Sequence, residues 1–272
     1  MAHIIEIENV TKTYGKHRGV DGISLAVEEG DIFAFLGPNG AGKSTTIRSM
    51  LGMLQYEGDI RILGMDARTQ KTEILKEVGY MPSEASFYPT MKVKDVIRFA
   101  ADMHRKDCSE EAGRLCEKLQ VDTRKKIQEL SLGNRKKVSI VCALQHQPKL
   151  LILDEPTSGL DPLMQDIFFR LLQEANKKGV TCFLSSHVLA EVKKYCRNAA
   201  IIKEGKILRV DTVENLSHTN LRLVKTWKDG KEEHFTHDGT MKELLKKLTA
   251  MEPDDVLIEE PSLEELFMQY YD

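Results

Sequence analysis

The sequence lacks any long uninterrupted run of apolar residues. A membrane-spanning helix needs roughly 18 to 20 of them in a row, and none of the 272 residues belongs to such a run. The N-terminus, Met-Ala-His-Ile-Ile-Glu, also lacks the basic segment and apolar stretch of a secretory signal peptide. We therefore expect a protein that stays in the cytosol.

Cysteine pairs at metal-binding spacing are absent too. The five cysteines are odd in number and form no C-x-x-C pair. Reduced, mostly buried thiols are therefore expected, rather than a disulfide framework or a zinc site.

An excess of positive charge is also missing. The formal net charge is -3, from 39 basic and 42 acidic residues, so the overall charge does not point to nucleic acid. Basic clusters at 124–126 and 135–137 are interpreted as solvated helix faces. The content of 41% hydrophobic and 30% charged residues is typical of a globular protein.

A glycine-rich loop is the most informative stretch that is present. It lies between an apolar, strand-like run at 31–36 and a helical pattern that includes Ile47, Met50 and Leu51. It consists of Gly37, Pro38, Asn39, Gly40, Ala41, Gly42, Lys43, Ser44 and Thr45. Such loops turn backbone N–H groups toward a β-phosphate, and the helix that follows directs its positive end at the same oxygens.

Two side chains of this loop suit a nucleotide with a divalent cation. Lys43 can reach the β- and γ-phosphates, and Ser44 offers a hydroxyl ligand to Mg²⁺. Strand, loop and helix in this order make an ordinary glycine turn the weaker interpretation.

Two further strand-like runs end in reactive side chains. The apolar run 150–153 is followed by Asp154 and Glu155, and the run 180–186 is followed by His187. Ligands bind at the carboxyl ends of strands in open α/β sheets. We interpret Asp154 as holding Mg²⁺, directly or through water, and Glu155 as polarising the attacking water. For His187 a catalytic role is favoured over a structural one.

The remaining segments are assigned from their periodicity. Strands are predicted at 3–10, 23–27 and 58–64, and a short helix at 72–78, after which Gly79-Tyr80-Met81-Pro82 breaks the pattern. Residues 92–144 are predicted to be mainly helical, and a further helix should bury Leu163 and end at Gly179. Tyr14, in a predicted polar loop, either stacks on a base or simply packs.

From about Thr212 the character of the sequence changes. The runs 221–227 and 232–236 flank a hairpin turn at Lys228-Asp229-Gly230. Thr240 and Ser262 each precede a glutamate by three residues, which predicts two capped helices. We expect the last helix to pack its apolar stripe on its own domain; the stripe consists of Leu263, Leu266, Phe267 and Tyr270.

A second short motif decides which family the sequence resembles. Residues 130–135 read Leu-Ser-Leu-Gly-Asn-Arg just before a helical pattern. Together with Tyr14, the glycine loop, the carboxylate strand and His187, this motif resembles the signature of an ABC transporter ATP-binding subunit, over about residues 4–210. The resemblance implies an α/β fold: a P-loop NTPase (RecA-like) core with an antiparallel β-subdomain and an inserted helical subdomain at about 85–147. The ATPase domain would span 1–215, and a small α+β accessory region 216–272.

The resemblance also implies roles for individual residues. Tyr14 would stack on adenine, residues 37–45 would hold the phosphates of ATP, and Glu155 would be the general base. Lys43 and His187 would act on the γ-phosphate, and Mg²⁺ would be the metal cofactor. Such proteins work as head-to-tail dimers, in which Ser131 and Gly133 of one subunit complete the ATP site of the other. Asp161 would belong to the D-loop.

Two departures from the family pattern stand out. Leu132 and Asn134 replace the usual glycine and glutamine of the signature. Ser83 stands where a glutamine usually contacts Mg²⁺ and the membrane subunit, and Glu84 is its neighbour; both are kept as candidate metal ligands.

The implied partners are an integral membrane transporter subunit and a second ATPase subunit, as a homodimer or a heterodimer, without nucleic acid. The protein would lie at the inner face of the cell membrane. The C-terminal part resembles ATPases of bacterial drug, antibiotic and peptide exporters. The alternatives are a soluble ABC ATPase that acts on ribosomes, DNA repair or cluster assembly, and a regulatory subunit with impaired hydrolysis.

Overall fold

The computed structural model describes residues 3–15, 17–217 and 221–259. The chain forms two compact units, Met1–Val210 and Asp211–Asp272. The predicted glycine loop, both carboxylates and His187 all belong to the first unit.

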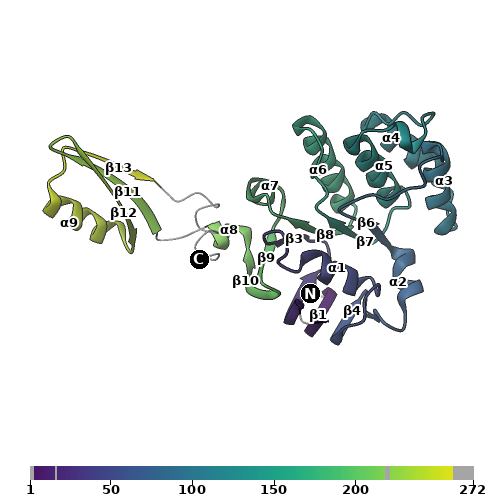
Figure 1. Ribbon diagram of the computed structural model, residues 1–272, viewed down its shortest axis with the longest axis horizontal. Helices are drawn as coiled ribbons and strands as arrows, with labels where there is room; N and C mark the ends of the chain where they lie inside the picture. Colours follow the sequence, from purple (N-terminus) through teal and green to yellow (C-terminus); the bar gives the residue numbers. More distant parts are fainter. Residues whose placement is uncertain (1–2, 16, 218–220, 260–272) are drawn as a thin grey trace. The chain divides into compact units, whose positions relative to one another are not determined.

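A six-stranded sheet forms the centre of the first unit (Figure 1). Its order is β10-β9-β3-β8-β7-β6, and the five strands from β9 to β6 run parallel. The strands are β3 (Ile32–Leu36), β6 (Val78–Met81), β7 (Leu150–Asp154), β8 (Thr181–Ser186), β9 (Asn198–Lys203) and β10 (Lys206–Thr212). Every residue of β3, β7 and β8 is buried, as expected for parallel strands with both faces covered. The prediction of a central strand at 150–153 is confirmed.

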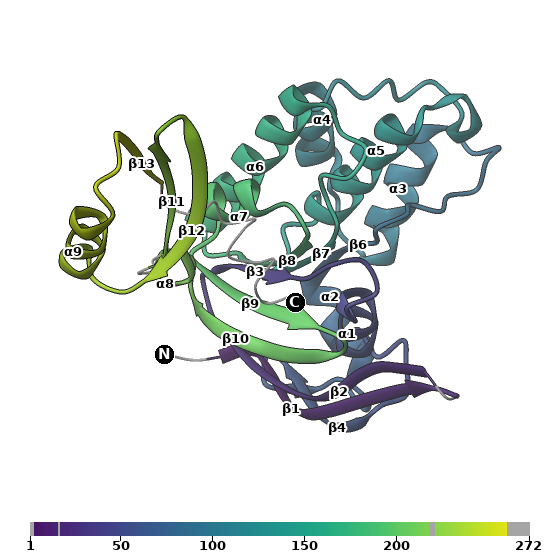
Figure 2. The same cartoon turned by 60° about the vertical axis from the view of Figure 1, so that its left-hand side comes forward.

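A four-stranded antiparallel sheet forms a second layer (Figure 2). Its order is β2-β1-β4-β5, and its strands are β1 (His3–Tyr14), β2 (His17–Glu28), β4 (Glu57–Ile62) and β5 (Met65–Asp66). The prediction of a loop around Tyr14 was wrong, because β1 continues to Tyr14 and pairs it with His17. Backbone pairing with β2 extends the strand beyond the apolar residues that marked it in the sequence.

The main core lies between these two sheets. Helix α1 (Lys43–Met50) contributes Ile47 and Met50 to the core, and the sheets contribute residues such as Phe35 and Ile60. Helix α2 (Lys71–Glu77) adds Ile74. Because α1 begins at Lys43, within the last residues of the glycine loop, the core fixes the helix that carries Lys43.

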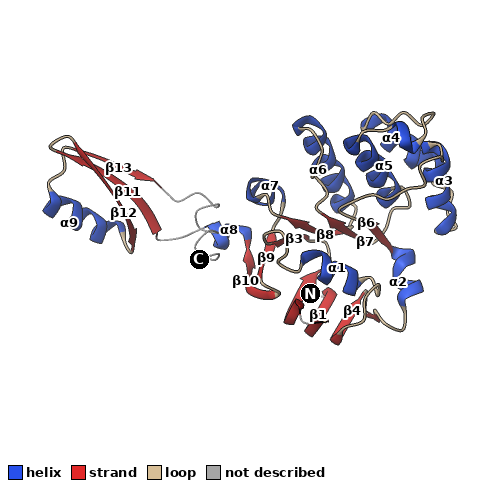
Figure 3. Ribbon diagram, viewed as in Figure 1, coloured by secondary structure: helices blue, strands red, loops and turns tan. Residues whose placement is uncertain are grey.

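A helical insertion follows β6, as predicted for residues 92–144 (Figure 3). It contains α3 (Val93–Met103), α4 (Ser109–Lys118), a short 3-10 helix (Ile127–Glu129) and α5 (Leu132–Leu144). The predicted end of the helical pattern before Gly79 is confirmed, because α2 ends at Glu77, and Gly79 lies inside β6, a strand that the sequence did not predict. A Cβ atom there would lie 2.1 Å from the carbonyl oxygen of Ala143, so glycine lets β6 approach the end of α5.

Two more helices complete the first unit, α6 (Pro162–Lys177) and α7 (Leu189–Tyr195). The apolar face of α6 buries Met164, Phe168 and Leu172. Leu163, predicted to be on this face, is exposed. In the first turn of α6, Met164 rather than Leu163 takes the buried position.

The second unit is a small α+β structure. It contains α8 (Val213–Ser217), β11 (Leu221–Lys228), β12 (Lys231–Asp238), α9 (Met241–Met251) and β13 (Asp255–Glu259), with sheet order β12-β11-β13. The predicted hairpin and the capping box at Thr240 are confirmed. Val224, Leu244 and Leu248 form its core. The second capping box, at Ser262, and the apolar stripe after it lie outside the described residues.

All five cysteines are free thiols, two of them buried and three partly buried. Burial raises the pKa of both Cys142 and Cys182 to about 12. These thiols therefore stay protonated at neutral pH and are poor nucleophiles.

Among the described residues, no helix combines the length and the apolar character that crossing a lipid bilayer requires.

Candidate nucleotide site

The glycine loop joins the end of β3 to the start of α1. Gly40 and Gly42 adopt positive φ angles of 83° and 107°, which glycine reaches without strain. A Cβ atom on Gly42 would lie 2.5 Å from the carbonyl oxygen of Gly19 in β2. The glycines therefore allow both the turn and its close packing on the antiparallel sheet, and Gly42 caps α1 without a side chain.

Lys43 is buried at the first turn of α1. Its Nζ donates hydrogen bonds to the carbonyl oxygens of Gly37 at 2.6 Å and Pro38 at 3.1 Å. The same Nζ lies 3.0 Å from Glu155 Oε1. The cation of the loop is thus in direct contact with the carboxylate predicted to be the general base.

Asp154 ends β7 and is 1% exposed. Its Oδ1 accepts a hydrogen bond from Ser185 Oγ at 2.7 Å, whereas its buried Oδ2 has no hydrogen-bond partner. A buried carboxylate oxygen without a donor is costly unless a cation or a bound water compensates it. Asp154 therefore fits a metal ligand, as its position after the strand predicts.

Glu155 has an unusual backbone, and its two carboxylate oxygens face Lys43 and His187. Its φ angle is 47°, a left-handed conformation that is uncommon for a residue other than glycine. Its N–H donates to Ser185 Oγ at 2.9 Å, and its Oε2 lies 2.8 Å from His187 Nδ1. The structure thus brings Lys43, Glu155 and His187 into one contiguous group. A strained backbone such as that of Glu155 is frequent at functional sites.

A cavity of about 390 Å³ lies against the glycine loop. Tyr14, Ser83 and Glu155 line it together with Ser44 and most of the loop. Glu84 is not among its lining residues. Arg18 and Gly19 of β2 also line it, and the sequence pattern did not single them out, since nothing marked β2 as part of a site.

The signature residues lie outside the lining of this cavity. Ser131 caps α5, and its Oγ accepts a hydrogen bond from the Asn134 N–H at 3.3 Å. A Cβ atom on Gly133 would lie 2.7 Å from the carbonyl oxygen of Gly159, so the signature packs closely on the loop that precedes α6. Leu132 is 63% exposed at the start of α5.

Asp161 has a similar local role. Its Oδ1 accepts a hydrogen bond from the Met164 N–H at 3.0 Å and so caps α6. The observed contacts of Ser131 and Asp161 are therefore those of helix caps.

Lys136 is a site residue that the sequence did not reveal. The prediction that 135–137 form a solvated face was wrong for Lys136, which is 3% exposed. Its Nζ donates to the carbonyl oxygens of Ser83 at 2.7 Å and Glu155 at 2.8 Å. Burial lowers the pKa of Lys136 to about 8, although nearby carboxylates, Asp154 first, oppose the shift. A lysine in a basic cluster gives no signal of burial, which arises only from tertiary packing.

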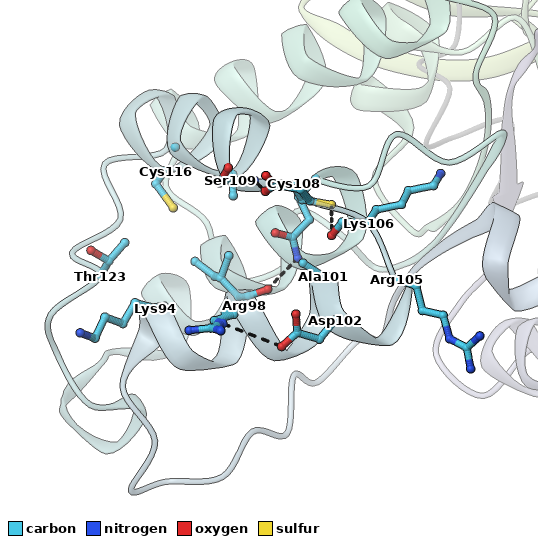
Figure 4. A pocket seen from close by; sticks show the side chains of 15 residues that line it. Lys94, Arg98, Ala101, Asp102, Arg105, Lys106, Cys108, Ser109, Cys116 and Thr123 are labelled. Carbon is cyan, nitrogen blue, oxygen red and sulfur yellow. Dashed lines mark hydrogen bonds and ion pairs between the residues drawn. The ribbon is translucent and has the colours of Figure 1, made fainter.

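A larger groove lies elsewhere, between α3 and α4 (Figure 4). Its volume is about 640 Å³, and its lining includes Ala101, Cys116 and the basic residues Arg98 and Lys106. None of the predicted site residues lines it. Volume alone therefore does not locate the chemistry, and the smaller cavity at the glycine loop is the candidate site.

Comparison with known proteins decides the family. The family model described as ABC transporter matches residues 20–158. The bacitracin transport ATP-binding protein BcrA of Bacillus licheniformis is 36% identical over 230 residues, which cover 83% of this chain and 75% of that protein. The chain belongs to the ABC transporter ATP-binding family. The implied family and its P-loop NTPase fold are thus confirmed.

Other relatives of this ABC ATPase agree. The linearmycin resistance ATP-binding protein LnrL of Bacillus subtilis is 33% identical over 219 residues, covering 78% of this chain and 70% of that protein. A solved structure described as the ATP binding subunit of an ABC transporter has a TM-score of 0.73 and 28% identity, and the match covers 78% of this chain and 91% of that one.

Proposed function

We propose that this ABC ATPase binds and hydrolyses MgATP as one half of a dimer and drives export through a separate integral membrane subunit, at the inner face of the cell membrane. The contiguous group of Lys43, Glu155 and His187 beside the glycine loop is the observation that carries this proposal. This group would bring a cation, a carboxylate and an imidazole to the γ-phosphate of a nucleotide bound on this loop.

The two ends of the cavity suit the two ends of ATP. Tyr14 offers a partly exposed aromatic ring at one wall, and an aromatic face binds a purine without specific hydrogen bonds. Residues 37–45 supply the loop N–H groups and the positive end of α1 for the phosphates. Four residues of the loop would contribute only through their backbone and their packing, namely Gly37, Asn39, Ala41 and Thr45.

Ser44 and Asp154 are the residues that would hold Mg²⁺, and Ser83 and Glu84 are further candidates. The unpartnered Oδ2 of Asp154 supports this assignment. Among the described residues, no group of three or more His, Cys, Asp or Glu side chains could hold a metal ion. This suits Mg²⁺, which is usually bound by few protein ligands together with substrate phosphates. When bound, the ion would neutralise phosphate charge.

Hydrolysis requires the contact between Lys43 and Glu155 to rearrange. Lys43 would exchange Glu155 and the loop carbonyls for the β- and γ-phosphates, which frees one carboxylate oxygen of Glu155. Glu155 would then orient and polarise the attacking water, while His187 holds the other oxygen and senses the γ-phosphate. An ATP-dependent exchange of ion pairs thus couples nucleotide binding to the general base.

A second ATPase subunit, either a copy of this chain or a related one, would complete the site. Ser131, Gly133 and the N-terminus of α5 would donate to the γ-phosphate of the other subunit's ATP, and Asp161 would lie at the dimer interface. The exposure of Leu132 supports an interface at this end of α5.

Export is favoured by the names of two relatives, which describe bacitracin transport and linearmycin resistance. A small accessory unit follows the ATPase domain, as the sequence resemblance implies for exporter ATPases. We propose no nucleic-acid partner.

Steady-state phosphate release by the purified chain tests this function. We expect turnover that saturates with ATP, requires Mg²⁺, and rises more steeply than linearly with protein concentration because dimers form. ATP binding without turnover at any protein concentration would instead indicate the hydrolysis-impaired regulatory subunit.

A further inference from the structure

Lys136 joins three parts of the molecule that the proposed reaction must keep in register. It lies on α5, the helix that begins at the signature. Its ammonium group donates to the carbonyl oxygen of Ser83, in the segment that replaces the usual glutamine, and to that of Glu155. Both acceptors belong to residues that line the nucleotide cavity.

The contact with Glu155 acts on a strained peptide. Glu155 has a left-handed φ angle of 47°, and such a conformation persists only where the surroundings hold it. Ser185 Oγ accepts from its N–H, and Lys136 Nζ donates to its C=O. The two contacts hold the backbone of Glu155 on both sides and thereby determine where its carboxylate can reach.

Packing alone does not account for a lysine at this position. An apolar side chain of similar length would avoid the desolvation of a buried ammonium. The neighbouring basic residues behave differently: Arg135 Nε donates to the Leu130 carbonyl oxygen, and Lys137 is only partly buried. Of these three basic side chains, Lys136 is the one whose ammonium group contacts residues of the candidate site.

We propose that Lys136 is a positioning residue for ATP hydrolysis, which fixes the backbone of Glu155 and ties it to residue 83 and to the signature helix. The proposal rests on the proposed function, because it concerns the efficiency of that reaction. Ser131 at the start of α5 would contact the partner's ATP, so a shift of this helix would reach Glu155 of the same chain through Lys136.

The test compares Lys136→Met, Lys136→Arg and the control Lys137→Met in the full-length chain. Met keeps the length of the side chain but has no donor, and Arg keeps the charge and several donors. We expect kcat of Lys136→Met to fall by about 10- to 100-fold, the range for loss of a charge-assisted hydrogen bond, with ATP affinity nearly unchanged. Lys136→Arg should recover part of kcat, and Lys137→Met should resemble the wild type.

Thermal melting establishes that each variant is folded, and Lys136→Leu, which also has no donor, replaces the Met variant if that variant does not melt cooperatively. Hydrogen exchange supplies a second measurement: amides around residues 83 and 155 should exchange faster in Lys136→Met than in Lys137→Met. Wild-type kcat in a folded Lys136→Met variant would overturn the positioning role, as would an equal loss of kcat and ATP affinity. Absence of turnover in the wild type would instead contradict the proposed function.

Discussion

The glycine loop and the signature represent two differently built ends of one proposed ATP site. Around the loop, Lys43 is buried and its ammonium group contacts two carbonyl oxygens and Glu155. At the signature, Ser131 is exposed and only caps its own helix, and Leu132 is 63% exposed.

This difference separates what one chain completes alone from what it offers to another. The loop end combines a cavity, a cation and two carboxylates inside one folded unit. The signature end presents a helix N-terminus and the apolar side chain of Leu132 at the surface, where a second subunit could reach both. We infer that a single chain binds ATP and that hydrolysis requires a dimer.

Glu155→Gln should have the largest effect, because it removes the base from the loop end and leaves the binding groups in place. We expect kcat to fall by about 10²- to 10⁴-fold, the usual contribution of a general base. ATP binding should persist and trap a closed dimer, which size-exclusion chromatography with ATP would detect. Undiminished turnover would rule out Glu155 as the base.

The glycine-loop end of the site could be predicted from the sequence because its residues lie in short local motifs. The glycine loop, Asp154, Glu155 and His187 each follow a strand-like run, and parallel strands bring their carboxyl ends together. The same rule explains the correct expectation of a parallel α/β core.

Tertiary packing decides the features that the sequence did not reveal. Lys136 resembles its basic neighbours in the sequence, and only the fold buries it against the carbonyl oxygens of Ser83 and Glu155. Gly79 marks the end of a helical pattern in the sequence, but only the fold shows that it lies in β6 and packs closely against the end of α5. Ser185 links Asp154 to the backbone of Glu155, but a serine inside an apolar strand gives no sign of this contact in the sequence.

Ser131→Arg tests the signature end. A long cation at this exposed position should prevent close approach of a second subunit, so we expect kcat to fall on the order of 10²-fold, as for loss of a donor to a developing charge. Binding of a fluorescent ATP analogue to the monomer should be unchanged. Normal ATPase rates in this variant would argue against a site shared between subunits.

Lys43→Ala should impair ATP binding, whereas Ser131→Arg impairs hydrolysis. Loss of the cation from the loop should weaken ATP binding by roughly 10- to 100-fold, the range for a hydrogen bond to a charged group, and turnover at low ATP should fall with it. Equilibrium titration with the fluorescent analogue measures the change. Unaltered affinity would show that Lys43 contacts Glu155 rather than phosphate in the bound state.

A buried histidine that belongs to neither the glycine loop nor the signature should affect the stability of the fold without affecting ATP turnover. His146 stacks on His104 with ring centroids 3.6 Å apart. Burial, aided by His104, lowers the pKa of His146 to about 4. The unfolded chain takes up a proton near pH 6.5 and the folded chain only near pH 4, so stability is complete above about pH 6.5 and falls as the pH drops toward 4.

Urea unfolding at pH 8 and pH 5 measures this effect. We expect the wild type to lose roughly 2 kcal/mol more than His146→Phe over this interval, because phenylalanine keeps the stacked ring and cannot be protonated. At pH 8 the two proteins should hydrolyse ATP equally. An identical pH dependence of stability in both would mean that His146 is not the responsible group.

Mixing Lys43→Ala with Ser131→Arg tests the central claim, that each site joins the loop of one chain to the signature of another. Each variant alone has two defective sites, but a mixed dimer has one intact site, formed by the loop of the Ser131→Arg chain and the signature of the Lys43→Ala chain. The test requires that the wild-type chain hydrolyses ATP without another protein. Under that condition, we predict that the mixture hydrolyses ATP clearly faster than either variant alone. A mixture no faster than its components would contradict the account.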